Sequence, residues 1–152
     1  VRIDDRMLHG QVVSTWLKDY NIEQVLIIND KAANDPIQKS VAGLAAPKEV
    51  KVHLFGVDQF IDILKKTPIK RKTMLIFTTS TDVLKLVENG LDIKEVNVGG
   101  MRYNENRKRL SKAVSVTPEE EEAFKKLIEK DIKVFIQMIP KSDESLMKNL
   151  LK

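Results

Sequence analysis

Short apolar runs and longer amphipathic segments alternate along the chain. The short runs are rich in β-branched residues, as is typical of strands buried on both faces of a parallel sheet. They cover residues 25–28, 51–55, 74–77, 95–98, 113–116 and 133–138. Segments with apolar residues on one helical face lie among these runs, at 10–20, 35–46, 57–65 and 81–89. The alternation predicts an α/β fold with an open, mostly parallel β-sheet that is covered by helices on both faces.

The clearest helix start lies at Thr117. This residue is suited to be an N-cap, Pro118 to occupy the first helical position, and Glu120 to complete a capping box. The final segment, 142–151, is predicted to form a short helix. Prolines and glycines fall between the patterned segments, without a linker, a low-complexity tract or an internal repeat. We therefore expect a single domain over residues 1–152.

The composition narrows the possible chemistry. The chain has 152 residues, no cysteine and only two histidines, His9 and His53. The lack of cysteine excludes a disulfide scaffold, a thiolate metal site and a cysteine nucleophile. Two distant histidines make an imidazole metal centre improbable, so we expect no metal site of this kind. The net charge of +4 is compatible with anionic ligands or acidic partners, but it is too small to indicate nucleic-acid binding by itself.

The densest group of reactive side chains lies at the start of the chain. Residues 2–9 contain two arginines, two aspartates and a histidine, and they run from an extended start toward the first predicted helix. A neutral imidazole such as that of His9 is a competent nucleophile, because its ordinary pKa is about 6.5. Arg6 offers a planar cation for phosphate oxygens, and Gly10 with the first helical amides favours an anion. His9 is therefore either a helix cap or part of an anion or phosphoryl site.

A second candidate loop follows the predicted strand at 74–77. The hydroxyl groups of Thr79 and Ser80 lie where they can bind a phosphoryl group. The alternative is structural, with Ser80 or Thr81 as an ordinary N-cap. Both interpretations can hold together.

Other features favour structural interpretations. Gly99 and Gly100 form either a tight turn or a rim of the site, and their context matches neither a Walker loop nor a dinucleotide fingerprint. Asn29 and Asp30 end a strand, where capping a loop is the more frequent role. His53 alternates with apolar neighbours and is interpreted as a sheet residue.

A basic stretch follows the predicted strand at 95–98. It includes Arg102, Arg107 and Arg109, with Tyr103 as its single aromatic residue. A nucleic-acid surface usually interleaves more aromatic residues with its cations. The alternatives are a solvated loop and a docking surface for an acidic partner, to which Arg2 is expected to contribute.

The string RIDDRMLHGQV at 2–12 resembles the histidine loop of the IIB component of the mannose-type (mannose–fructose–sorbose) bacterial sugar phosphotransferase system, the PTS. Residues 27–30, followed by Ala33 and Asp35, are similar to a second signature of this family. Residues 97–102 are similar to a third. The order and spacing match, so the resemblance covers the whole chain.

The resemblance implies a phosphocarrier that transfers a phosphoryl group from the phosphohistidine of a IIA component to a sugar held by the membrane IIC and IID components. Its motif positions make His9 the phosphoryl carrier, through Nδ1, with Arg6 and Asp4 as its partners. The remaining expected contacts are Gly10, Gln11, Thr79 and Ser80 for the phosphoryl group, and Arg2, Arg102, Arg107 and Arg109 for partner docking. The implied location is the cytoplasm, peripherally at the membrane complex, and a homodimer is compatible with this role. The alternative is a non-catalytic α/β module that binds nucleotide or nucleic acid through the basic loop.

Overall fold

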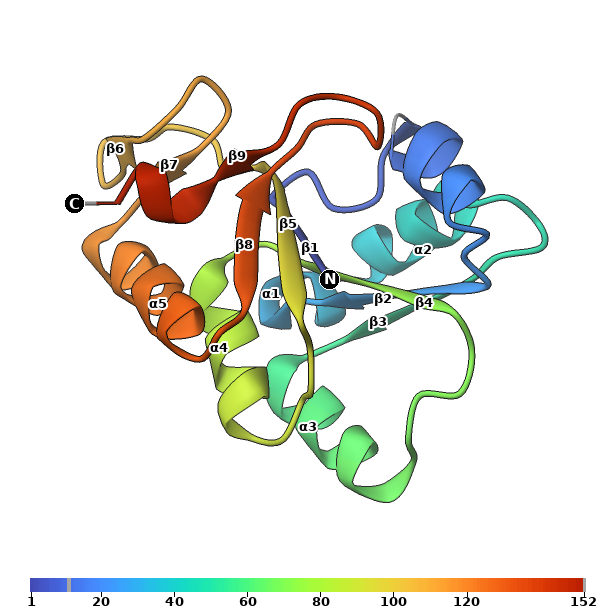
Figure 1. Ribbon diagram of the computed structural model, residues 1–152. Coiled ribbons are helices and arrows are strands. Elements are labelled where there is room, and N and C mark those ends of the chain that lie inside the picture. Colours follow the sequence, from blue (N-terminus) through green and yellow to red (C-terminus); the bar gives the residue numbers. More distant parts are fainter. Residues whose placement is uncertain (11, 152) are drawn as a thin grey trace.

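The computed structural model describes residues 1–10 and 12–151. A seven-stranded sheet forms the centre of the molecule. Its strands are β1 (Arg2–Asp4), β2 (Gln24–Ile28), β3 (Lys51–Phe55), β4 (Thr73–Phe77), β5 (Glu95–Gly100), β8 (Lys133–Ile136) and β9 (Ser145–Leu146). They lie side by side in the order β3-β2-β4-β1-β5-β8-β9 (Figure 1). The pairs are parallel except for β8 with β9. The predicted mostly parallel sheet is confirmed, and five of the six predicted strands belong to it.

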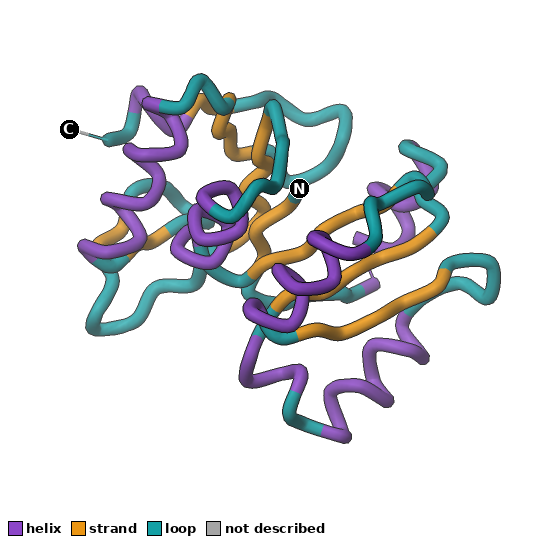
Figure 2. Tube along the Cα trace, turned by 90° about the horizontal axis from the view of Figure 1, so that it is seen from below, coloured by secondary structure: helices purple, strands orange, loops and turns teal. Residues whose placement is uncertain are grey.

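Helices lie on both faces of the sheet, as predicted (Figure 2). They are η1 (Val12–Leu17, with π-type hydrogen bonding), α1 (Asp30–Ala33), α2 (Pro36–Ala45), α3 (Val57–Lys66), α4 (Ser80–Glu88), α5 (Pro118–Glu129) and the 3-10 turn η2 (Met147–Asn149). Alternate residues of a strand point to opposite faces. Val25 and Ile27 of β2 accordingly pack with η1 and α2, whereas Leu26 and Ile28 belong to the cluster that includes α3, α4 and α5.

Side-chain caps define the starts of α2, α4 and α5. Thr117 Oγ1 accepts a hydrogen bond from Glu120 N at 3.1 Å, and Glu120 Oε1 accepts one from Thr117 N at 2.9 Å, so the predicted capping box is confirmed. Helix α4 begins one residue earlier than predicted. Its N-cap is Thr79 rather than Ser80 or Thr81, because the Thr79 hydroxyl accepts from Thr81 N.

Two predicted elements differ from the structure. Ser115–Val116 (β7) does not join the main sheet but pairs antiparallel with Lys108–Arg109 (β6) in a separate ribbon. The segment 142–151 is not a continuous helix, because it contains β9 and then η2. Leu146 pairs with Phe135 and covers the outer edge of β8, while Met147 is fully buried. Strand pairing at an otherwise open edge thus overrides the local helical pattern.

Strand β1 lies in the middle of the sheet, between β4 and β5. The chain leaves β1 through η1 toward β2 on one side, and it leaves β5 through α5 toward β8 on the other side. In open α/β sheets, ligands bind at the carboxyl ends of the strands where the strand order changes direction in this way. The fold therefore places the loop after β1 at the position where a ligand site is expected.

Candidate functional site

The loop that follows β1 is organised around the carboxylate of Asp4, which is fully buried. Asp4 Oδ1 accepts hydrogen bonds from Arg6 N at 3.1 Å and from Arg6 Nε at 3.0 Å. Asp4 Oδ2 accepts from Arg2 Nη2 and Arg6 Nη2, both at 3.1 Å, and lies 3.3 Å from His9 Nε2. The structure thus brings together Asp4, Arg6 and His9, the three residues expected to carry the chemistry.

Opposing effects determine the protonation of Asp4. Burial by itself raises the pKa of this carboxyl group, but hydrogen bonds from Arg6 and the charges of Arg2 and Arg6 outweigh burial. The pKa of Asp4 consequently lies below its ordinary value. The hydrogen bond to Asp4 also raises the pKa of Arg6. At neutral pH the site therefore contains one buried anion between two cations.

The ionised Asp4 selects one tautomer of the neutral His9 ring. A carboxylate can only accept hydrogen bonds, so the nitrogen beside Asp4 Oδ2, which is Nε2, has to carry the ring proton. The lone pair then resides on Nδ1, the nitrogen that the sequence resemblance implies as the phosphoryl acceptor. Asp4 holds the His9 ring on one side. The His9 side chain is 24% exposed, so the ring is still accessible to a partner.

The backbone of the loop explains how His9 reaches this position. Met7 has a φ of 60°, in the left-handed region that residues other than glycine rarely adopt, and Met7 N donates to Asp4 O at 2.9 Å. The turn reverses the chain immediately after the strand, and the buried Leu8 anchors it. His9 and the exposed Gly10 follow directly. The predicted phosphoryl contact Gln11 lies outside the described residues.

Arg2 is buried, so the prediction that it contributes to a docking surface is wrong. Its side chain is 2% exposed, and its guanidinium carbon lies 4.9 Å from the centroid of the Trp16 ring. Nη1 donates to Asn97 Oδ1 and, at 3.4 Å, to Gln137 O. Arg2 therefore lines the interior side of the site, where its charge faces Asp4.

Gly99 leaves room for Arg2. A Cβ atom on Gly99 would lie 2.0 Å from Arg2 Nη2 and 2.2 Å from Arg2 Cζ, which is closer than any real contact. The register between β1 and β5 also shifts here, since Ile3 pairs with Val98 but Asp4 pairs with Gly100. The two glycines are thus the end of a strand, not a tight turn.

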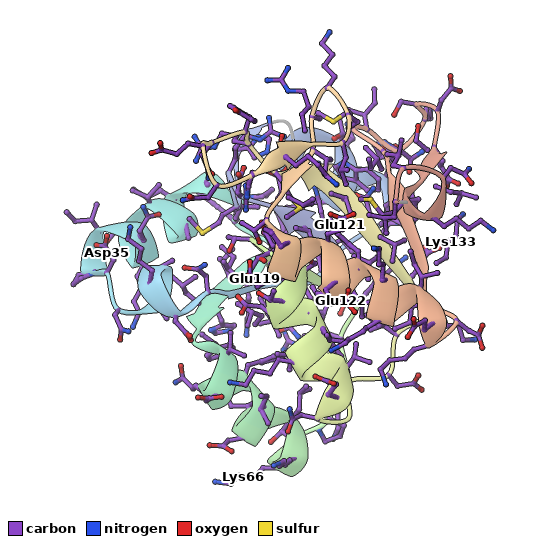
Figure 3. All side chains as sticks on the ribbon, turned by 90° about the vertical axis from the view of Figure 1, so that its left-hand side faces the viewer. Asp35, Lys66, Glu119, Glu121, Glu122 and Lys133 are labelled. Carbon is purple, nitrogen blue, oxygen red and sulfur yellow. The ribbon has the colours of Figure 1, made fainter. Side chains whose placement is uncertain are left out.

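Within the basic loop, Arg107 serves a structural purpose. It donates to both carboxylate oxygens of Glu120, at 2.9 and 2.8 Å, and to Asp5 Oδ2 at 3.4 Å. Its side chain is only 13% exposed. Arg107 therefore does not belong to an open docking surface, contrary to the prediction. Lys108 also pairs with Glu121, which Figure 3 labels beside Glu119 and Glu122 at the start of α5. These bonds attach the basic loop to α5.

Two other arginines of this loop remain open to the outside. Arg102 is 76% exposed, and its Nε lies 3.5 Å from Asp5 Oδ1. Arg109 is exposed and its guanidinium carbon lies 5.3 Å from the Tyr103 ring centroid. Both can meet a partner, because neither is enclosed by the fold.

The loop after β4 lies next to the His9 loop, because β4 pairs with β1. The hydroxyl of Ser80 is not available to a ligand, contrary to the prediction: it is fully buried and donates to Glu120 O at 2.8 Å. Thr79 is partly exposed, but its hydroxyl already caps α4. Of the two predicted contacts in this loop, only Thr79 remains accessible.

Asn29 and Asp30 have the capping roles that the sequence favoured. Asn29 Oδ1 accepts from Ala32 N at the start of α1, and Asp30 Oδ1 accepts from Val57 N at 2.7 Å. Sequence reasoning did not foresee that Asn97, noted only within a family signature, binds Arg2, or that Glu120, expected only in the capping box, also binds Arg107. The available signal for Asn97 was a polar side chain in an otherwise apolar strand. Among the described residues, no group of three or more metal-ligating side chains could hold a metal ion, and no helix is long and apolar enough to cross a membrane.

Comparison with known proteins gives consistent similarities. The family model described as "PTS system sorbose subfamily IIB component" matches residues 1–152. The "PTS system mannose-specific EIIAB component" of Escherichia coli (strain K12) is 35% identical over 151 residues, which cover 99% of this chain and 47% of that protein. The chain thus spans about half the length of this relative. The "PTS system fructose-specific EIIB component" of Bacillus subtilis is 35% identical over 95% of this chain and 88% of the relative.

Solved structures match over nearly the whole fold. The crystal structure of the IIBSor domain of the sorbose permease from Klebsiella pneumoniae superposes with a TM-score of 0.93 at 30% identity, covering 99% of this chain and 93% of that one. An N-acetylgalactosamine-specific IIB component from Escherichia coli superposes with a TM-score of 0.87 at 33% identity, covering 95% of each chain.

Proposed function

Because the chain belongs to the family of PTS sorbose-subfamily IIB components, we propose that it is a phosphocarrier. His9 accepts a phosphoryl group from the phosphohistidine of a IIA component and donates it to a sugar held by the membrane IIC and IID components. The protein acts in the cytoplasm, peripherally at this membrane complex, and requires no cofactor. The observation that carries the proposal is the buried Asp4 carboxylate, which joins two arginines to the imidazole of His9.

The accepting step is an attack by the Nδ1 lone pair of neutral His9 on phosphorus. The new N–P bond forms while the N–P bond of the donor histidine breaks, and that electron pair returns to the donor ring. The proton on Nε2 stays in place, so the loaded ring of His9 is a phosphorylated imidazolium. Asp4 stabilises its positive charge in the way that a carboxylate stabilises an imidazolium in a catalytic triad.

The donating step reverses the bond changes at His9. A sugar hydroxyl oxygen attacks phosphorus, the N–P bond breaks, and the electron pair returns to Nδ1, while the hydroxyl proton passes to water. The imidazolium form helps this step, because its ring leaves as neutral imidazole. Phosphoryl transfer depends mainly on positioning and charge stabilisation, which this loop is built to supply.

Arg6 is the principal group for the phosphoryl oxygens. Its side chain is 38% exposed while it remains bonded to Asp4, so its outer edge can face an anion on His9. Amide groups at Gly10 and Gln11 and the hydroxyl of Thr79 complete the proposed binding group. Arg102 and Arg109 are the proposed docking contacts, and the joint name EIIAB of the Escherichia coli relative supports a IIA partner.

The first prediction tests His9 as the carrier. Incubation of the chain with phosphorylated IIA is expected to give one acid-labile, base-stable phosphoryl label per chain. His9→Gln is expected to abolish this label, because no nucleophilic nitrogen remains beside Asp4. His53→Gln is the matched control, since His53 lies on the edge strand β3 and its loss should leave labelling unchanged.

Label that persists in His9→Gln, or no label in the unmodified chain, would reject the phosphocarrier. Nucleic-acid binding that weakens steeply with salt and depends on Arg102 and Arg109 would instead favour the binding-module alternative. One observation speaks against this alternative: Arg107 already donates to Glu120 and Asp5, so its charge is not free to bind nucleic acid.

A further inference from the structure

We infer that Arg2 is a positioning residue for phosphoryl transfer, and that Gly99 is needed because it leaves space for the Arg2 side chain. The inference rests on the proposed role of His9. Arg2 reaches the carboxylate of Asp4 from the side opposite to solvent, with Nη2 3.1 Å from Oδ2. This is the same oxygen that lies 3.3 Å from His9 Nε2. Arg2 is 2% exposed and its nearest link to His9 runs through this shared oxygen, so we place its effect on His9 through Asp4.

The orientation of Arg2 is fixed from several directions. Asn97 Oδ1 and Gln137 O accept from Nη1, and the ring of Trp16 lies against the guanidinium. These contacts come from β5, from the residue after β8 and from η1. Gly99 provides the remaining side, because any side chain there would overlap the guanidinium. Such fixation keeps Asp4 Oδ2 in one place relative to the imidazole.

The two arginines have different electrostatic roles, because Arg2 is buried and Arg6 is partly exposed. Arg2 is 2% exposed, so water cannot screen its charge, and that charge offsets Asp4 permanently. Arg6 is part-exposed and also binds Asp4. When a phosphoryl group arrives on His9, Arg6 can turn part of its interaction toward the new anion, because Arg2 continues to balance Asp4. Without Arg2, Asp4 and the phosphoryl group would compete for a single cation.

The test compares two neighbouring glycines. Gly99→Ala is expected to displace the guanidinium of Arg2 without changing any charged residue. Gly100→Ala is the matched control, because a Cβ atom there would lie 3.5 Å from Arg6 Nη2 and Asp4 Oδ1, an ordinary contact. Both variants are examined as the full chain, with circular dichroism and urea unfolding to establish that they fold.

The first readout is the tautomer of the neutral His9 ring, measured by ¹⁵N NMR on histidine-labelled protein with His53 as internal reference. We expect a predominant Nε2–H tautomer in the unmodified chain and in Gly100→Ala, and a mixture of tautomers in Gly99→Ala. The second readout is the rate of transfer from phosphorylated IIA. At metal sites, losing an outer partner of a ligand side chain typically costs about 10–100-fold in affinity or activity, and we expect a loss of this order in the transfer rate of Gly99→Ala alone.

Substitutions at Arg2 provide the second route if Gly99→Ala does not fold. Arg2→Lys keeps the charge and is expected to retain more of the Nε2–H tautomer and of the transfer rate than Arg2→Met. Equal tautomer populations and rates in the two glycine variants, or in the two Arg2 variants, would overturn the inference. The NMR readout needs no phosphoryl donor. A tautomer shift without any labelling of His9 would therefore uphold the role of Arg2 toward His9 and reject the phosphocarrier.

Discussion

At the scale of single residues, the candidate site depends on how one buried carboxylate is neutralised. Arg2 and Arg6 exceed Asp4 by one positive charge, and a phosphoryl group adds about two negative charges. With the positive charge of the imidazolium ring included, the loaded site of the proposed carrier is close to neutral, whereas the empty site carries one positive charge. Neither state leaves a large net charge in the site, which suits a carrier that has to accept the group and pass it on.

Replacing Asp4 tests this balance as a change in stability. Asp4→Asn leaves Arg2 buried without its anion, and breaking a buried pair in this way costs about 3–5 kcal/mol of unfolding free energy. Because the folded pKa of Asp4 is depressed, its contribution is complete above the unfolded value of about 3.9 and disappears as the pH falls through the folded pKa. Urea unfolding from pH 7 downward should thus show the gap between variant and unmodified chain narrowing below pH 4.

His9→Gln is the control, because it leaves Asp4 and both arginines in place. Its stability should follow the pH dependence of the unmodified chain. A constant gap for Asp4→Asn down to the lowest pH measured would contradict an ionised Asp4 in the folded state.

The grouping of charged side chains in the histidine loop could be predicted from the sequence, because its signal is local. Asp4, Arg6 and His9 lie within six residues, and the turn at Met7 brings them together. The placement of Arg2 could not be predicted in the same way. Its partners Asn97 and Gln137 lie 95 and 135 residues further along the chain, so an arginine in the interior looks like any other arginine in the sequence.

At the scale of elements, the starts of α4 and α5 meet where acidic groups gather. Asp82 lies in the first turn of α4, half-buried, and its surroundings raise its pKa to about 6. The causes are burial, the nearby charges of Asp30 and, more weakly, Glu120, with Lys85 opposing them. The hydroxyl of Ser80 on the carbonyl of Glu120 joins the same two helices. The packing of these two helices therefore holds the Asp82 carboxylate in surroundings that disfavour its ionised form.

This arrangement predicts a pH-dependent gain from Asp82→Asn. The folded pKa of about 6 exceeds the unfolded value of about 3.9, so ionised Asp82 destabilises the fold increasingly from pH 4 to 6 and by a constant amount above. Allowing for solvent screening of a half-buried group, the variant should gain about 1 kcal/mol of unfolding free energy at pH 8 and almost nothing at pH 4. Chemical denaturation at both pH values measures this difference.

Asp58→Asn is the matched control, since Asp58 is 84% exposed and pairs with the same Lys85 at 2.8 Å. It should give no such gain. Equal effects of the two substitutions, or a gain for Asp82→Asn that persists at pH 4, would be inconsistent with a penalty from ionisation.

At the scale of the whole molecule, the apolar residues divide unequally between interior and surface. The interior cluster against α3, α4 and α5 contains Phe77 and Phe124, both fully buried. Helix α2 instead exposes Ile37, Val41 and Leu44, which are 73%, 53% and 87% exposed. The alternation of runs in the sequence predicted the layers of the fold. The same pattern could not predict which apolar residues of a helix are exposed to solvent, because their exposure depends on how α2 packs against the sheet.

The division predicts contrasting effects on stability. Phe124→Ala should lower the unfolding free energy by about 3–5 kcal/mol, because it leaves a cavity between α5 and the sheet. Leu44→Lys should change it by no more than about 0.5 kcal/mol, because the side chain already lies in solvent. Urea unfolding of both variants measures the contrast. A large loss for Leu44→Lys would mean that α2 is covered in solution.

The central position of β1 has a consequence for the order of folding. Arg2 pairs with Ile76 on one side and with Asn97 on the other, so the strand that leads into the histidine loop acquires its neighbours only from distant parts of the chain. Long loops must close before these contacts form, which slows folding relative to helical proteins of similar size. On a ribosome, β1 emerges before both of its neighbours and stays unpaired until β4 and β5 have followed it. The histidine loop is therefore expected to reach its folded arrangement late, when the middle of the sheet closes, so a partly synthesised chain without β5 should lack the arrangement of Asp4 and His9 that the proposed function needs.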